Sequence, residues 1–130
     1  MTFASLLLAA ALVTPAAPQP RWTDIGITAV GNHVSVDPRS VKRTGNLVSA
    51  TVRVLFTPPV QTPKGPWASS QTKATFDCAR QSVAAKENAY FADAGGRRLT
   101  ERTVNRMPGY GPALKGSMVQ VALTWLCRAH

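Results

Sequence analysis

Apolar and polar residues alternate along much of the chain, with the period of two that is typical of half-buried β-strands. The clearest case is the stretch 47–57, which we expect to form a central strand. Its predicted inward face consists of alternate apolar residues: Val48, Ala50, Val52, Val54 and Phe56. The turn signal Gly45-Asn46 lies just before it and predicts antiparallel pairing with the preceding segment. Two shorter strands are predicted over 22–28, with Ile25 and Ile27 on one side, and over 33–37.

A further strand is predicted over 73–78, which alternates up to Cys78. The four prolines of the preceding residues, 58–70, predict a long loop, because proline has no N–H to donate to a strand ladder. Trp67 is the one aromatic residue of that loop, and we expect it to pack back on the sheet. Either this loop or the basic segment described next could carry function.

Residues 80–93 admit two interpretations. The run 84–87 contains good helix formers, whereas the pair Gly95-Gly96, flanked by strand-like segments, favours a hairpin running to Val104. We predict the hairpin. Its second strand would present alternate residues on one face: Arg98, Thr100, Arg102 and Val104. A basic strand over 97–106 fits a charged sheet edge better than it fits a binding patch.

After an irregular stretch, 107–116, the residues from Ser117 to Arg128 support two opposite predictions. Alternation predicts a strand, because every second residue from Val119 to Cys127 is apolar or cysteine. A helical wheel is also satisfied, and Ser117 followed by Gln120 has the spacing of a capping box at a helix start. The pattern by itself leaves the two open.

The first 13 residues are uncharged and, apart from Thr2 and Ser5, apolar, and small residues follow at Thr14-Pro15-Ala16. This predicts a signal peptide over 1–16, cleaved after Ala16, and a mature domain over 17–130. This apolar run is shorter than the roughly 20 apolar residues that a transmembrane anchor would need. It also lacks the amphipathic face that a core helix would need. No cysteine lies near the predicted cut, so we expect an exported protein, periplasmic or secreted, without a lipid anchor.

Cys78 and Cys127 are the chain's two cysteines. In an oxidising compartment an even number of cysteines predicts a disulfide. This bond would fasten the C-terminal segment to the strand that ends at Cys78. Closing a loop of about 50 residues contributes about 4 kcal/mol to stability in the chain-entropy model.

The 130 residues suffice for one domain, and their net charge is +9. An exported domain of this charge is expected to be attracted to anionic envelope components or an acidic protein. We do not expect nucleic acid as a partner, because neither a recognition helix nor an aromatic stacking motif is present. Charge that serves solubility alone is the simpler explanation.

Candidate chemistry is sparse. His33, Ser35 and Asp37 suggest a catalytic triad, but alternate strand residues lie about 6.6 Å apart, too far for successive hydrogen bonds. With two histidines and two paired cysteines we expect no zinc site, and no glycine-rich phosphate loop is present. We therefore expect no catalytic, cofactor-binding or metal site, and no cofactor.

Taken together, several segments resemble the surface-adhesin protein E family of small exported bacterial domains, over 22–127. The resemblance rests on Trp22, on the run from Val34-Ser35-Val36-Asp37-Pro38 to Thr44-Gly45-Asn46, on Ser69-Ser70 followed by Phe76-Asp77-Cys78, and on Gly116-Ser117 before Cys127. It implies an α+β fold, in which an antiparallel sheet of about six strands carries a C-terminal helix, tethered to its concave face by the disulfide. It also implies a possible homodimer.

Three functions follow from these observations. The first is a non-enzymatic envelope binding module with an unknown partner. The second is a secreted adhesin that binds host matrix proteins, as the family name suggests. The third is a periplasmic enzyme, which would require a pocket containing Asp24, His33 or Asp37.

Overall fold

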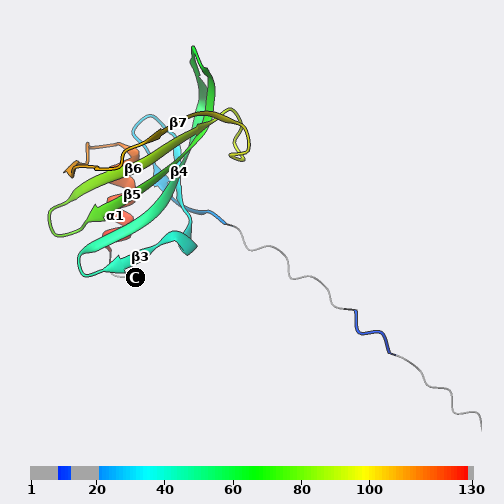
Figure 1. The fold of residues 1–130 in the computed structure, drawn as a ribbon, viewed down its shortest axis with the longest axis horizontal. Coiled ribbons are helices and arrows are strands. Elements are labelled where there is room, and N and C mark those ends of the chain that lie inside the picture. The colour runs from blue at the N-terminus through cyan, green and yellow to red at the C-terminus, as the bar shows by residue number, and fades with distance from the viewer. Residues whose placement is uncertain (1–8, 13–20, 129–130) are drawn as a thin grey trace, which may run out of the picture.

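The computed structural model describes residues 9–12 and 21–128. Within them the chain forms a curled antiparallel sheet with one helix, α1, against one side (Figure 1). In chain order the elements are β1 (Thr23–Ile27), β2 (His33–Val36), the 3-10 helix η1 (Pro38–Ser40), β3 (Lys42–Thr44), β4 (Leu47–Thr62), β5 (Gly65–Asp77), β6 (Ser82–Phe91), β7 (Leu99–Val104), β8 (Gly111–Pro112) and α1 (Met118–Cys127). Most of the predicted signal peptide, including the predicted cut after Ala16, lies outside the described residues.

The sheet follows the order β1-β2-β4-β5-β6-β7, and the short strands β3 and β8 pair with β4 and β6. The predicted α+β fold with about six strands is thus confirmed. β3 turns into β4 at Gly45-Asn46, with Thr44 opposite Leu47, as the turn signal predicted. The predicted inward face of β4 is buried from Val48 to Val54, and Phe56 packs at its margin.

The C-terminal segment is a helix, which settles the open choice between strand and helix. Ser117 is its N-cap and its hydroxyl accepts the N–H of Gln120 at 3.3 Å, while the Gln120 side chain accepts the N–H of Gly116 at 2.5 Å. α1 buries Ala122, Leu123 and Leu126 against the sheet. These form one core with the sheet's inward residues: Val34, Val36, Val48, Ala50, Val52, Val54, Ala74 and Phe76.

Cys78, just after β5, is disulfide-bonded to Cys127 at the end of α1, with Cα atoms 5.4 Å apart. The predicted pairing is therefore confirmed. Phe76, two residues earlier, is fully buried in the same cluster as Leu126. The bond and the core beside it hold the C-terminal end of α1 against the concave side of the sheet.

The predicted loop over 58–70 is wrong. β4 and β5 instead form one long hairpin, whose arm extends beyond the body of the sheet (Figure 1). The pairing is interrupted after Leu55, which faces Ser69, and resumes at Val60, which faces Trp67. Pro58 and Pro59 lie in this interruption, where strand residues have no ladder bond to lose. Pro58 and Pro59 therefore lie where the ladder is interrupted locally, and they do not end the strand.

The predicted hairpin after Cys78 is confirmed as β6 and β7, and its first strand begins earlier than expected. The stretch 107–116, predicted irregular, contains the two-residue strand β8, which pairs with β6. In β1 the register shifts between Asp24 and Gly26. Ile25 therefore packs against the core, whereas Ile27 is 55% exposed, so the two residues predicted to share one side of the strand differ in burial.

Candidate functional site: a basic trough on the outer face of the sheet

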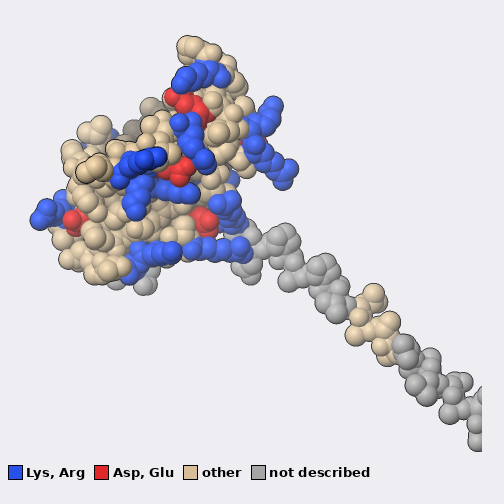
Figure 2. Space-filling view, viewed as in Figure 1, with Lys and Arg blue, Asp and Glu red and all other residues tan. Residues whose placement is uncertain are grey.

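The face of the sheet opposite α1 carries many of the chain's cations, with few acidic side chains between them (Figure 2). A shallow cavity of about 360 Å³ lies on this outer face, across η1, β3, β4, β5 and β6. Its cationic residues are Arg39, Lys42, Lys73 and Lys86, all exposed. We call this cavity the basic trough.

The floor of the basic trough consists of short side chains. Ser49 and Thr51 come from β4 and Thr75 from β5, on the strand positions that alternate with the buried core residues. The hydroxyl oxygens of Ser49 and Thr75 lie 3.2 Å apart across the two strands. The floor is therefore a surface of short, hydroxyl-bearing side chains, and the lysine and arginine side chains around it are longer.

A hydrogen-bond network holds η1 beside the trough. The Asp37 carboxylate accepts the backbone N–H of Arg39 at 3.0 Å and Nε of Arg21 at 3.1 Å. The Ser40 hydroxyl donates to the Asp37 carbonyl at 2.6 Å and accepts the N–H of Thr51 at 2.8 Å. Because Ser40 bonds directly to β4, the backbone around Arg39 is fixed at the edge of the trough.

The trough contains more positive than negative charge. Two acidic residues lie beside it, and both already have cationic partners: Asp37 pairs with Arg21 at 3.1 Å, and Glu87 is shared between Lys73 at 3.3 Å and Arg102 at 2.8 Å. Within residues 9–12 and 21–128, Arg39, Lys42 and Lys86 form no ion pair. These three cations remain available to an anionic ligand.

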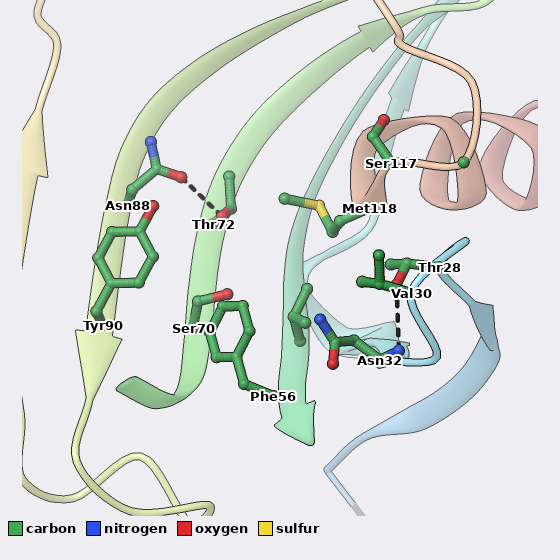
Figure 3. Close-up of a pocket in the computed structure, with 12 residues that line it drawn as sticks. Thr28, Val30, Asn32, Phe56, Ser70, Thr72, Asn88, Tyr90, Ser117 and Met118 are labelled. Carbon is green, nitrogen blue, oxygen red and sulfur yellow. Dashed lines mark hydrogen bonds between the residues drawn. The ribbon is translucent and has the colours of Figure 1, made fainter. Parts of the chain in front are cut away.

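A second cavity, of about 290 Å³, opens on the concave side at the start of α1 (Figure 3). Met118 of α1, Val30 of the β1–β2 turn and Phe56 of β4 contribute apolar surface. Polar groups come from the strands, where the Thr72 hydroxyl donates to the Asn88 side-chain oxygen at 2.8 Å. The lining contains no histidine, carboxylate, lysine or cysteine.

An aromatic cluster borders this second cavity. Trp67 stacks on Tyr90 with ring centroids 3.9 Å apart, and Phe56 lies 6.3 Å from Trp67. The prediction that Trp67 packs back on the sheet is therefore confirmed, although Trp67 belongs to a strand. Burial, and secondarily the charge of Glu101, raise the pKa of the Tyr90 phenol above its ordinary value.

The residues considered for a triad have separate partners. His33 Nδ1 lies 3.1 Å from Asp24 Oδ2 on the exposed surface, whereas Asp37 binds Arg21 and the backbone of η1. Ser35 is buried in β2. Neither the basic trough nor the second cavity is lined by Asp24, His33 or Asp37. A periplasmic enzyme built on these residues therefore gains no support from the geometry.

The basic strand predicted over 97–106 corresponds to β7, at one edge of the sheet. The backbone N–H groups of Arg97 and Arg98 bind the Asp93 carboxylate, and the Thr100 hydroxyl donates to the Pro66 carbonyl at 2.9 Å. Arg102 pairs with Glu87. The sequence predicted a charged sheet edge here and gave no sign of the trough, whose cations come from two separate segments, 39–42 and 73–86.

Two further properties of the described part of the chain bear on function. No group of three or more His, Cys, Asp or Glu side chains there could hold a metal ion. No helix there is long and apolar enough to cross a membrane. The disulfide is a bond typical of exported proteins.

The fold defines a class of small domain, in which a curled antiparallel sheet holds one disulfide-tethered helix. The sequence model of the surface-adhesin protein E family matches residues 22–128, and the chain belongs to this family. The resemblance seen in the sequence is thus confirmed. A comparison with curated protein sequences found no match.

Solved structures of protein E from Haemophilus influenzae have the same fold. One crystal form superposes with a TM-score of 0.59 at 13% identity, covering 92% of this chain and 96% of that chain. Protein E from non-typeable Haemophilus influenzae superposes with a TM-score of 0.55 at 11% identity, covering 87% and 79%. At these identities the likeness shows the architecture.

Proposed function

We propose that this protein is an exported, non-enzymatic binding module of the bacterial cell envelope, which meets an anionic partner on the outer face of its sheet. The observation that carries this proposal is the basic trough. Arg39, Lys42 and Lys86 are exposed, have no acidic partner among the described residues, and surround one cavity on the face that α1 leaves uncovered. Uncompensated cations around a cavity attract anions and steer their association.

Two further properties support a binding role. The family is named for surface adhesins, and the disulfide together with the long β4–β5 ladder makes the sheet a firm platform. The second cavity offers hydroxyl and amide groups but no nucleophile paired with a base. These features therefore support a binding function better than they support a catalytic one.

A secreted adhesin that binds host matrix proteins is the second candidate, and the family name favours it. It would use the same outer face, but on a partner outside the cell. Where the protein resides decides between the two candidates. Confinement to the periplasm would exclude the adhesin, whereas release into the medium or display on the cell surface would favour it.

The test is photocrosslinking in living cells that express the tagged full chain. A photoreactive amino acid replaces Lys86, in the basic trough, or Thr124, which is exposed on α1 and serves as the control position. Cells are irradiated and separated into cytoplasm, periplasm, membranes and medium. We expect adducts outside the cytoplasm from position 86 and few from position 124. A chain retained in the cytoplasm, or equal adducts from both positions, would contradict the proposal.

A further inference from the structure

We infer that the basic trough binds a linear acidic polysaccharide, whose carboxylate or sulfate groups contact Arg39, Lys42 and Lys86 while its hydroxyls contact the floor. This inference rests on the proposed binding function and names the class of partner. It follows from the spacing of the cations, the chemistry of the floor and the position of the trough within the sheet.

The cations are spaced for a chain of anions. Lys42 lies on β3, Lys73 on β5 and Lys86 on β6, with β4 between β3 and β5. Neighbouring strands are about 4.8 Å apart, so three strand spacings separate β3 from β6, or about 14 Å. A single phosphate or carboxylate would contact the cations at both ends of this distance only if both lysine side chains bent inward toward it. A polymer with charges at regular intervals can contact both without such bending.

The floor suits a sugar. Ser49, Thr51 and Thr75 offer hydroxyl groups that can donate and accept hydrogen bonds, which is what the hydroxyls of a saccharide require. The charged groups of the saccharide would lie above this floor, where the exposed heads of Lys42 and Lys86 stand. Charge-assisted hydrogen bonds to these groups are stronger than neutral ones.

Other anionic macromolecules fit less well. Among the described residues, none of the large exposed hydrophobic side chains lines the trough, so it has no apolar wedge to insert into a lipid surface. It contains no aromatic side chain on which a nucleobase could stack. An acidic peptide would gain most by adding a strand to a sheet edge, but β4 and β5 both have hydrogen-bonded neighbours on each side. The strand of the trough that pairs on one side alone, β3, is three residues long and offers little edge for such a strand.

The experiment measures binding of the full chain, purified from the cell fraction to which it is delivered, to fluorescently labelled polysaccharides. Polygalacturonate tests carboxylates, heparin tests sulfates, and dextran is the neutral control. The trough variant is Lys42→Glu/Lys86→Glu. The matched control is Arg80→Glu/Lys115→Glu, which changes net charge equally at exposed residues that do not line the trough. Thermal unfolding verifies that both variants fold.

We expect the wild type to bind at least one acidic polysaccharide and not dextran, with affinity that falls as salt increases. The trough variant should bind about tenfold more weakly or worse, and the control variant less than threefold more weakly. A preference for polygalacturonate or for heparin identifies the charged group. Equal weakening in both variants would show that net charge alone acts, and would overturn the inference.

Equally tight binding of duplex DNA or of phosphatidylglycerol vesicles, lost in the same trough variant, would also overturn the polysaccharide. Failure of the polysaccharide inference can be distinguished from failure of the proposed binding function. If no polysaccharide binds but crosslinked adducts form at position 86 in the envelope, the binding module remains and its partner is of another class. If neither is observed, both proposals are wrong.

Discussion

Gly116, which leads the chain into α1, lies directly against Ala29 of the β1–β2 turn. The Ala29 N–H donates to the Gly116 carbonyl at 2.9 Å, and a Cβ at position 116 would lie 2.7 Å from the Ala29 Cβ. Gly116 also has a φ of +79°, a conformation that side-chain-bearing residues rarely adopt. This contact joins the start of the helix to the sheet, 87 positions earlier in the chain.

We therefore expect Gly116→Ala to destabilise the protein. Backbone strain and displacement of the β1–β2 turn should together lower the free energy of unfolding by about 1–3 kcal/mol. Urea unfolding at equilibrium measures this change. Gly109→Ala is the matched control, because a Cβ there meets nothing within 4 Å, and its unfolding midpoint should barely move. Equal midpoints for the two variants would contradict the contact.

Removal of the disulfide should be the largest single loss. Replacing Cys78 and Cys127 together by serine opens a loop of 49 residues, and we expect a loss of about 4 kcal/mol, chiefly because the unfolded chain gains freedom. Urea unfolding with and without reductant measures it. Reductant should destabilise the wild type by a similar amount and leave the double variant unchanged. A wild type insensitive to full reduction would show that the bond adds no stability.

The N-cap of α1 can be tested separately. Ser117→Ala removes the hydroxyl that accepts the Gln120 N–H, and we expect a loss of about 1 kcal/mol in the free energy of unfolding. Ser117→Asp retains an acceptor for the same N–H and should recover much of that loss. The measurement is urea unfolding with the disulfide intact. An alanine variant as stable as the wild type would contradict a stabilising cap.

Tyr90 should give the protein a pH response on the alkaline side. Burial and the charge of Glu101 raise its pKa, so the folded state favours the neutral phenol. The stability that this contributes is complete below the unfolded pKa of about 10, and is lost as pH rises through the folded pKa. Phenolate absorbance during alkaline titration, as the difference between wild type and Tyr90→Phe, measures the ionisation.

Glu101→Gln provides the matching variant for Tyr90. It removes the negative charge that disfavours the phenolate, so the pKa of Tyr90 should fall toward its ordinary value. It also removes the ion pair between Glu101 and Lys64, at 3.6 Å, in which the lysine is exposed and the glutamate half-buried. A solvent-accessible pair of this length should matter little for stability. An unchanged Tyr90 titration in this variant would leave burial as the sole cause of the raised pKa.

The strands were predictable wherever one side of the sheet is buried. Val48, Val52 and Val54 alternate with polar residues because β4 has a core face and an outer face. The arm from Pro58 to Trp67 was not predictable in the same way. A proline in the sequence indicates only that one backbone N–H donor is missing. Whether its position falls in an interruption of the strand pairing depends on the partner strand.

The basic trough was beyond prediction from the pattern. Arg39 and Lys73 are 34 residues apart in the sequence, and Lys73 and Lys86 are 13 apart. The pairing of β4, β5 and β6 brings their segments to one cavity. The cations that looked clustered in the sequence, Arg97 and Arg98, lie instead before an edge strand, where their backbone binds Asp93.

The sequence by itself determined which side of each main strand faces the core, where the central turn lies, and that Cys78 could bond Cys127. The alternation of apolar and polar residues is a local property, and burial of one face of the sheet imposes it directly. The number of cysteines is read from the sequence by counting. Tertiary structure decided that the segment after Ser117 is a helix, that the prolines lie within a hairpin, and that scattered cations share a trough. Each of these depends on which distant residues meet, and one-dimensional periodicity does not encode that.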